Sequence, residues 1–384
     1  MTDGGERPSM PRPLRIGVVC FPSLGGSSVV ASELALGLAE RGHEVHLMAS
    51  ACPARAHESE RLAFHPVVVP GYPLFEHPPY GLAVASLIVE VTRRHALDLV
   101  HVHYAVPHAS SALLARQVLG ARAPRLVTSL HGTDVAPLGA DPSYRTVTAH
   151  AVAVSDQIVV PSAFLRAQVY ARLGVPADVA VEIIANFVDT DRFAPAAEPR
   201  MGAASAPVRL IHVSNLRPVK RAHDLVEVLA RVRRHLDASL TIIGDGPDRD
   251  AVVARAVALG VERHLELLGK RADFVDELRR ADAFVLPSAI ESFGVAALEA
   301  LSAGVPVFGY RVGGLPEVVV DGVGRLVEPF DVDALAHAVV ETVSSPAAHA
   351  AMGRAARAHV LTRYRREPAI DRYLATFHRA LELA

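Results

Sequence analysis

The sequence contains very little cysteine and no tryptophan, and it has no excess charge of either sign. Its only two cysteines, Cys20 and Cys52, exclude a disulfide framework and favour a reducing compartment such as the cytoplasm. The 39 basic and 41 acidic residues nearly cancel, so nucleic acid is not an expected partner. No apolar run approaches the roughly 18 residues of a membrane span, and the polar, Pro-rich segment 1–13 lacks the apolar core of a signal peptide. We therefore expect a cytoplasmic protein without a membrane partner.

Lysine and asparagine are also scarce. Only Lys220 and Lys270 occur among the 39 basic residues, and Asn186 and Asn215 are the only asparagines. Because the chain uses arginine almost everywhere else, a lysine or an asparagine suggests a chemical requirement at its position.

The 384 residues, 51% of them hydrophobic, suit two domains with separate cores. Short β-branched runs alternate with amphipathic helical stretches, which is typical of α/β proteins. This pattern predicts two doubly wound parallel sheets whose carboxyl ends face one another across an interdomain cleft. The expected strands are Leu14–Cys20, Glu44–Ala49, Val67–Val69, Leu97–His103, Leu126–Leu130, Ile158–Val160, Val208–Ser214, Leu240–Gly244, His264–Leu267, Ala283–Leu286, Val305–Phe308 and Arg325–Val327.

The alternation stops in the middle of the chain and then restarts. Residues 191–207, and most clearly Phe193–Pro207, are rich in Pro and Ala without periodicity, so they are predicted to be an interdomain linker. Two long helices, Pro346–Arg363 and Glu367–Leu383, are expected to end the chain.

The first candidate site is a glycine-rich turn after the first strand. Gly25 and Gly26 allow close approach to a ligand, and Ser27 and Ser28 begin a helix whose N–H groups favour an anion. The turn is not the G-x-G-x-x-G fingerprint, which argues against an NAD-dependent oxidoreductase. A tight turn without a ligand is the simpler alternative.

The second candidate is a polar cluster at two strand ends. His101 and His103 alternate along one strand, Tyr104 and His108 follow it, and the segment 131–134 (His-Gly-Thr-Asp) follows the next strand. No acidic or cysteine partner stands at a familiar zinc spacing, so we expect no metal here. Each single histidine is equally compatible with a structural role.

The third candidate is the basic turn Asn215–Arg221 at a helix start. Three cations would be available to a diphosphate here: the point charge of Lys220 and the guanidinium groups of Arg217 and Arg221. The helix dipole adds positive potential at the same place. Gly244 begins a second tight turn in the same half. The alternative is a solvated helix start.

The fourth candidate is the most specific of the four. Glu291 and Glu299 enclose a turn of Ser292, Phe293 and Gly294 that exposes backbone N–H groups at a helix start. A carboxylate at each end could hold two hydroxyls about one sugar-nucleotide apart. Isolated glutamate pairs at this spacing are common, but a pair embedded in this turn after a strand is not.

With these motifs the chain resembles the family 4 retaining glycosyltransferases, which have the GT-B fold, over nearly its whole length. Glu291 and Glu299 correspond to that family's E-x7-E element, whose first glutamate contacts the donor sugar and whose second contacts the ribose. The family's phosphate-binding Arg and Lys stand five residues apart. Lys220 matches the lysine, but Asn215 occupies the arginine position, which makes Arg217 the candidate to replace it.

This departure, with the segments CFPSLGGSSVVASELALGLAERGHEVH and HVSNLRPVKR, resembles the subgroup that begins bacillithiol biosynthesis. The resemblance implies transfer of N-acetylglucosamine from UDP-GlcNAc to the hydroxyl of L-malate with retention of the α configuration. It also implies residues 13–190 as an acceptor-binding domain and 208–366 as a nucleotide-sugar-binding domain. Helix 367–384 would pack back on the first domain.

The resemblance implies same-face attack in which the departing phosphate accepts the acceptor's proton. His131, Lys220, Arg217 and Glu291 are then the expected catalytic residues, with His131 orienting the sugar. No DxD-type motif stands at the site to hold a divalent metal, so neither a metal nor a cofactor is expected. Ser27, Tyr104, Thr133 and Asn215 are the expected acceptor-binding residues. The expected donor-binding residues are Gly25, Gly26, Asn215, Lys220, Gly244, Glu291, Ser292, Phe293, Gly294 and Glu299.

Two other functions compete with this interpretation. The same family includes enzymes with other acceptors, such as inositol phosphate or a glycan. A two-lobed sugar-binding protein has a similar architecture, but it would need an export signal and would not need Lys220 beside paired glutamates. The sequence leaves the oligomeric state open, and a homo-oligomer is compatible with it.

Overall fold

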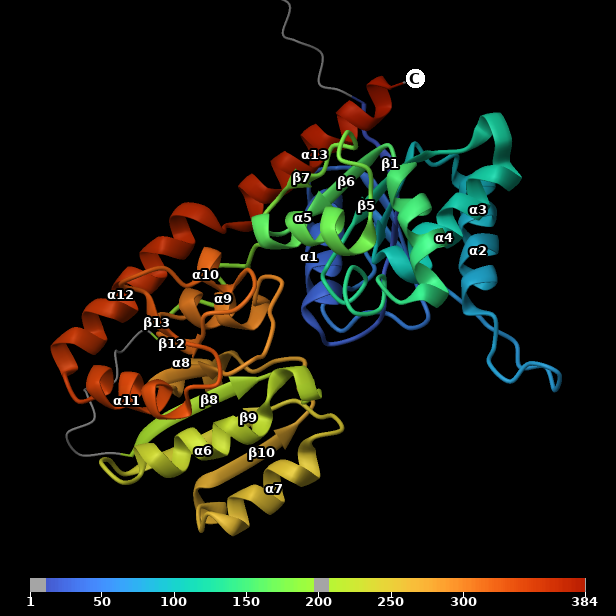
Figure 1. The fold of residues 1–384 in the computed structure, drawn as a ribbon. Coiled ribbons are helices and arrows are strands. Elements are labelled where there is room, and N and C mark those ends of the chain that lie inside the picture. Colours follow the sequence, from blue (N-terminus) through green and yellow to red (C-terminus); the bar gives the residue numbers. More distant parts are fainter. Residues whose placement is uncertain (1–11, 197–206, 384) are drawn as a thin grey trace, which may run out of the picture.

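A computed structural model describes residues 12–196 and 207–383 and contains two parallel sheets in this part of the chain (Figure 1). The first sheet has seven strands in the order β3-β2-β1-β4-β5-β6-β7. Its strands are β1 (Arg15–Val19), β2 (Glu44–Ala49), β3 (Leu62–Pro66), β4 (Leu99–His103), β5 (Arg125–Ser129), β6 (Gln157–Val160) and β7 (Glu182–Ile183).

The second sheet has six strands among the described residues, in the order β10-β9-β8-β11-β12-β13. They are β8 (Val208–Val213), β9 (Ala238–Ile243), β10 (Leu265–Gly269), β11 (Ala283–Leu286), β12 (Val307–Tyr310) and β13 (Gly324–Val327). All paired strands in both sheets are parallel, which requires crossover connections and buries both sheet faces.

Helices cover both faces of each sheet. On the first sheet, α1 (Gly26–Glu40) and α13 (Arg366–Glu382) share one core, while α2 (Tyr80–His95) and α3 (Ser110–Leu119) share the other. On the second sheet the two cores contain one helix group each: α6 (Ala222–Val232), α7 (Arg249–Ala258) and α11 (Val332–Val343) on one face, and α8 (Val275–Arg280), α9 (Val295–Ser302), α10 (Leu315–Val318) and α12 (Pro346–Arg363) on the other. The remaining α-helices are α4 (Pro142–Ala153) and α5 (Ala163–Gln168). The predicted doubly wound α/β fold is confirmed.

The strand order of each sheet reverses once, and this reversal locates the binding crevice. In the first sheet the chain moves outward from β1 to β2 and β3, then returns to β4 on the other side of β1. In the second sheet the same reversal occurs between β8 and β11. Ligands of open parallel sheets bind outside the carboxyl ends of strands at such a point. The loops after β1, β4, β8 and β11 are therefore expected to line the binding site.

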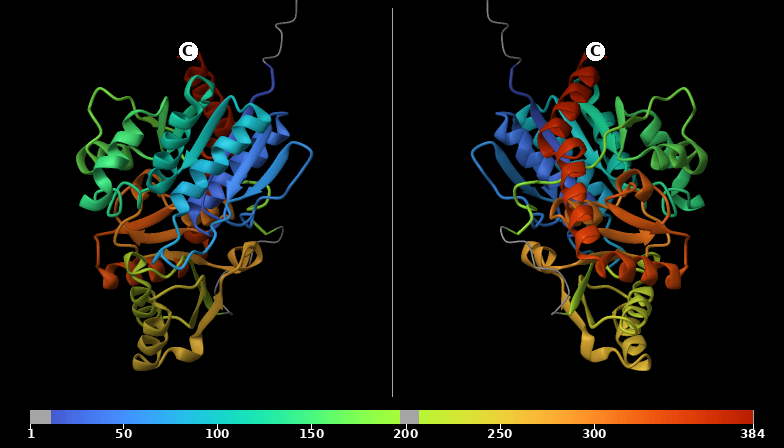
Figure 2. Two further views of the ribbon diagram at one scale, coloured as in Figure 1. Left: turned by 90° about the vertical axis from the view of Figure 1, so that its right-hand side faces the viewer. Right: turned by 90° about the vertical axis from the view of Figure 1, so that its left-hand side faces the viewer.

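The C-terminal helices connect the two halves. Helix α12 packs on α9 of the second sheet, whereas α13 contacts α1, β5 and β6 of the first. Figure 2 (right) shows α13 running along the first domain. Buried apolar residues fix it there, namely Ile370, Tyr373, Phe377 and Ala380.

Some predicted boundaries are wrong. Val67–Val69 does not form a strand, because β3 is the preceding segment Leu62–Pro66, paired residue by residue with Val45–Ala49, and Val68 is 73% exposed. The short strand β7 was not predicted, since two residues carry no periodicity. Most of the predicted linker lies outside the described residues, but Phe193 at its start is 1% exposed and its ring packs at a tilt against that of Phe274 in the second domain.

No helix in the described part of the chain is both long enough and apolar enough to cross a membrane.

Candidate active site

The glycine-rich turn after β1 begins α1 at an end without a side-chain cap. Gly25 is the N-cap, and the first turn of α1 contains no acidic side chain. The unpaired N–H groups and the positive end of the helix dipole are therefore available to an anion. A Cβ on Gly26 would lie 3.0 Å from a methyl group of Val295 in α9, so the turn directly meets the second domain.

A buried carboxylate joins the loops that follow β4 and β5. Asp134 accepts hydrogen bonds from the backbone N–H groups of Ala105 (3.0 Å), His131 (3.0 Å) and Gly132 (2.8 Å). Burial raises the pKa of Asp134, and these three donors oppose that rise by stabilising the ionised form. The two polar segments predicted from sequence are thus held together as one unit.

The histidines of this unit form a mostly buried network. His131 Nε2 lies 3.0 Å from His103 Nδ1, and His108 Nδ1 lies 2.5 Å from the His103 carbonyl oxygen. Burial lowers the pKa of His131 to about 3, and it also lowers the pKa of His103. His131 is therefore neutral near pH 7 and a weak base, which suits an orienting hydrogen bond better than proton abstraction.

Three of the four predicted acceptor residues come together. Tyr104, whose φ is +84°, interacts through its hydroxyl with Ser27 and Thr133. Burial raises the pKa of Tyr104 and the nearby Asp134 adds to the rise, while these hydroxyl contacts and the charge of Arg217 oppose it. Arg217 belongs to the second domain, so the cluster faces the basic turn across the cleft.

The second domain presents Lys220 beside Glu291. Lys220 lies in the short 3₁₀ turn Pro218–Lys220 after β8, and its Nζ donates to Glu291 Oε1 at 2.5 Å. Ser288 Oγ donates to the same oxygen at 2.8 Å. Two predicted site residues, 71 positions apart in the chain, therefore form one charged pair at the switch point of the second sheet.

The turn that contains Gly244 packs against the basic turn without space for side chains. A Cβ on Gly244 (φ +128°) would stand 1.6 Å from the carbonyl oxygen of Ser214, and one on Gly246 would stand 2.0 Å from that of Asn215. Both glycines are needed for this close approach. Gly244 thus supports the shape of the site from behind Ser214, and Gly246 does so from behind Asn215.

Of the three cations predicted in the basic turn, Arg221 has a structural role. Its guanidinium forms two hydrogen bonds to Asp224 (2.7 and 3.0 Å) and lies 4.6 Å from the ring centre of Phe330. Asp224 also accepts from the Tyr310 hydroxyl at 2.7 Å. Arg217 is exposed and Lys220 is partly exposed, so these are the two cations that a diphosphate can reach. Asn215 is exposed as well.

The residues of the Ser-Phe-Gly turn have different surroundings, since Phe293 is buried in the core and Ser292 faces the loop after β5. Phe293 is 3% exposed and packs edge-on against Tyr364, so its side chain stabilises the second domain and cannot line the cleft. Gly294 (φ +95°) is the N-cap of α9. A Cβ on Gly132 would lie 1.7 Å from Ser292 Oγ, so the loop after β5 closes directly onto this turn.

Glu299 has a partner that sequence reasoning did not find. Its carboxylate is buried in α9 and lies 2.7 Å from a guanidinium nitrogen of Arg55, which belongs to the loop after β2 in the first domain. Arg55 also lies 4.0 Å from Glu33 of α1 and 5.2 Å from the ring centre of Phe193. Burial raises the pKa of Glu299, and Arg55 opposes this rise.

Two further interdomain contacts were missed. Ser162 Oγ donates to the carbonyl oxygen of Ser292 at 2.7 Å. Glu317 in the second domain accepts from the backbone N–H groups of Ala163 and Phe164, both at 2.9 Å, and so caps α5 of the first domain. The local sequence shows none of this, because each contact joins residues far apart in the chain that only the packing of the two domains brings together.

Replacing Arg55 by methionine should lower stability because it leaves Glu299 buried without its cation. We expect a fall in melting temperature of roughly 5 °C. The unpaired carboxyl will have a folded-state pKa above its unfolded value, so it favours folding at low pH and this contribution is lost as pH rises through the folded pKa. The defect should be larger near pH 8 than near pH 5, and Glu299→Gln should reduce it. Equal melting temperatures for Arg55→Met and the exposed control Arg122→Met at high pH would contradict this role.

Comparison with known proteins agrees with the geometry. Residues 24–192 match the family model "Glycosyltransferase Family 4", and residues 198–359 match "Glycosyl transferases group 1". A Bacillus anthracis N-acetyl-alpha-D-glucosaminyl L-malate synthase is 37% identical over 96% of this chain and 97% of its own length. A GDP-mannose-dependent alpha-(1-6)-phosphatidylinositol monomannoside mannosyltransferase of Mycolicibacterium smegmatis is 32% identical over 88% of this chain and 91% of its own.

Solved structures support the fold independently. Sucrose-phosphate synthase from Thermosynechococcus elongatus superposes with a TM-score of 0.81 at 19% identity, covering 97% of this chain and 100% of that one. With the two sheets, the facing loops and the nearly full-length relatives taken together, the chain belongs to the family 4 glycosyltransferases and has the GT-B fold.

Proposed function

We propose that this glycosyltransferase moves N-acetylglucosamine from UDP-GlcNAc to the hydroxyl of L-malate with retention of the α configuration, the first step of bacillithiol biosynthesis. The observation that carries the proposal is the pairing of Lys220 and Glu291 opposite the cluster of Ser27, Tyr104 and Thr133. A donor site for a charged diphosphate thereby faces a small polar cluster in the other domain. The 37% identity to the malate-glycosylating relative supports this choice of substrates.

The reaction breaks the bond between the anomeric carbon and the β-phosphate oxygen and forms a bond from that carbon to the malate oxygen. The malate hydroxyl proton passes to the departing phosphate oxygen on the same face of the sugar, so no protein base is required. Lys220 and Arg217 stabilise the charge that develops on UDP. These two cations supply the compensating positive charge from the protein, so we propose that transfer is independent of a metal.

Glu291 and His131 position the sugar. Glu291 holds Lys220 and offers an acceptor to a sugar hydroxyl, whereas the neutral His131 orients the sugar from the first domain. The close contact of Gly132 with Ser292 brings these two residues' loops together. Closure would exclude water and hold the reacting oxygen near the anomeric carbon.

The acceptor site offers hydrogen-bond donors on two sides. The start of α1, with Gly25 as its N-cap, provides backbone N–H groups for one carboxylate. Tyr104, Thr133 and Asn215 provide side-chain donors for the second. An acceptor with a carboxylate at each end and a hydroxyl between them fits this arrangement.

Thr133→Ala and Asn215→Ala should raise the KM for malate about tenfold while changing the KM for UDP-GlcNAc much less, because each removes one hydrogen bond to a charged group. UDP release should depend on L-malate and be slow with D-malate, whose hydroxyl points away from the anomeric carbon. A coupled UDP-release assay over a panel of donors and acceptors measures both effects. Thr362→Ala, on the exposed surface of α12, is the matched control.

Faster turnover with inositol phosphate or a glycan than with L-malate would show that the acceptor assignment is wrong. An equal rise of both KM values in Thr133→Ala would contradict a role specific to the acceptor. Neither result would change the assignment to the glycosyltransferase family.

A further inference from the structure

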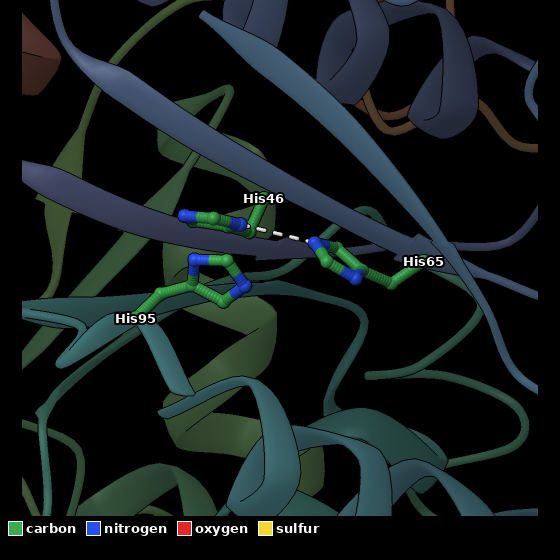
Figure 3. A group of neighbouring side chains, drawn as sticks. All are labelled: His46, His65 and His95. Carbon is green, nitrogen blue, oxygen red and sulfur yellow. Dashed lines mark hydrogen bonds between the residues drawn. The ribbon is translucent and has the colours of Figure 1, made fainter. Parts of the chain in front are cut away.

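Three histidines gather on the first domain outside the cleft (Figure 3). His46, His65 and His95 each offer a ring nitrogen, and these atoms lie within 4.8 Å of one another. His46 Nδ1 and His65 Nε2 are 3.0 Å apart, and the rings of His46 and His95 have centres 4.1 Å apart. Among the residues that the structure describes, this is the one group of three or more His, Cys, Asp or Glu side chains with donor atoms so close.

Rigid elements hold all three side chains. His46 belongs to β2 and His65 to the neighbouring edge strand β3, which is paired with β2 along its whole length. His95 is the last residue of α2, which ends at Ala96 in the left-handed conformation. The side chains therefore converge from two strands and a helix end, and little ordering remains for a ligand to impose.

A carboxylate behind the cluster fixes its tautomers. Glu44 Oε1 lies 3.0 Å from His46 Nε2, so this nitrogen carries the proton and donates to it. The lone pair of His46 Nδ1 then points at His65 Nε2. His95 Nδ1 lies 3.8 Å from the same carboxylate oxygen, so Glu44 is close to two of the three rings. A carboxylate that holds the outer nitrogen of a histidine is the usual arrangement behind a metal ligand.

The surroundings of His46 and His65 favour the binding of a cation. Burial lowers the pKa of His46 to about 4 and also lowers the pKa of His65. Glu44, Glu58 and Glu90 bring negative charge toward these rings, and Arg94 opposes them. The negative end of the α2 dipole also points here, because His95 stands in its last turn.

We propose that His46, His65 and His95 bind one Zn²⁺ ion, with Glu44 orienting His46 and water completing the coordination. Imidazole nitrogens bound to Zn²⁺ at about 2.0–2.1 Å stand roughly 3.3 Å apart in tetrahedral geometry, close to the 3.0 Å between His46 and His65. The ion replaces the proton now shared by those two nitrogens. His65 keeps its neutral charge by carrying that proton on Nδ1 instead.

This ion would stabilise the fold and take no part in transfer. Glu44 and His46 lie in the first half of β2, whereas the cleft loops leave the carboxyl ends of the strands. The ion would tie the edge strand β3 to β2 and to the end of α2. No metal was expected from the sequence, and an ion at this site leaves the proposed metal-independent transfer unchanged.

The test is isothermal titration of Zn²⁺ into tag-free, chelator-treated full-length protein. We expect one equivalent to bind and to raise the melting temperature, with His65→Ala and His95→Gln each abolishing both effects. Glu44→Gln should weaken binding by roughly 10- to 100-fold, as expected for a residue that supports a ligand. His337→Ala, an exposed histidine on α11, is the matched control and should bind like the wild type.

Co²⁺ provides a second readout, because coordination by histidines gives visible absorption that the two histidine variants should lose. Turnover of His95→Gln should match that of the wild type at 25 °C, which shows that this variant is folded. Absence of Zn²⁺ binding would overturn the proposal. So would binding that persists in His65→Ala and His95→Gln but disappears in His131→Ala, because the ion would then occupy the cleft.

Discussion

Lys220→Ala is expected to reduce turnover by on the order of 10²- to 10³-fold, the usual effect of removing one group that stabilises a developing anion. It should also weaken the binding of UDP and UDP-GlcNAc alike by roughly 10- to 100-fold, since both carry the diphosphate and a charge-assisted hydrogen bond contributes about 1.5–3 kcal/mol. The side chain of Lys220 is only 22% exposed and is already fixed by Glu291. Its ammonium group therefore needs little ordering when the diphosphate arrives.

The chain offers a matched control for this experiment. Lys270 is the only other lysine and is exposed at the surface of the second domain, so Lys270→Ala should leave turnover and UDP affinity unchanged. Lys220→Arg should restore only part of the activity, because a planar guanidinium does not fit where a compact ammonium contacts Glu291. Titration calorimetry with UDP measures the binding effect. If Lys220→Ala binds UDP as the wild type does, Lys220 belongs to a solvated helix start.

The fold was predictable because the sequence patterns that indicate its strands and turns are local. Parallel strands buried on both faces produce short β-branched runs, and the Gly-rich and basic turns that follow β1 and β8 mark where those strands end. The prediction failed where the signal was not local. Val67–Val69 has the composition of a strand, yet the neighbouring strand β2 pairs with Leu62–Pro66 instead.

The contacts of the candidate site were likewise predictable in part. Lys220, Glu291 and the Ser27, Tyr104 and Thr133 cluster were predictable, because each follows a strand and strand ends converge in this topology. Arg55 was not, because it stands in a loop without a motif and meets Glu299 across the contact between the two domains.

The histidine cluster escaped prediction for a similar reason. His46, His65 and His95 have none of the short spacings that mark metal ligands, and the pairing of β2 with β3 is what brings the first two together. Spacing along the chain reports a metal site only when one local element supplies most of its ligands.

Glu291→Gln is expected to lower turnover by on the order of 10²-fold without weakening UDP binding. Glutamine keeps the shape of the side chain but removes the charge that orients Lys220 and accepts from the transferred sugar. UDP lacks that sugar, so it loses no contact.

The structure sharpens this expectation. Glu291 accepts from Lys220 at 2.5 Å, so the carboxylate competes with a diphosphate for the same ammonium. Its removal should leave the affinity for UDP equal or higher, while the sugar is held less well in the transition state. Single-turnover kinetics with UDP-GlcNAc and L-malate, together with calorimetry of UDP, separates the two effects, and Glu328→Gln on the exposed surface serves as control. Loss of UDP affinity in step with turnover would mean that Glu291 acts on the nucleotide, and near-normal turnover would remove it from the catalytic residues.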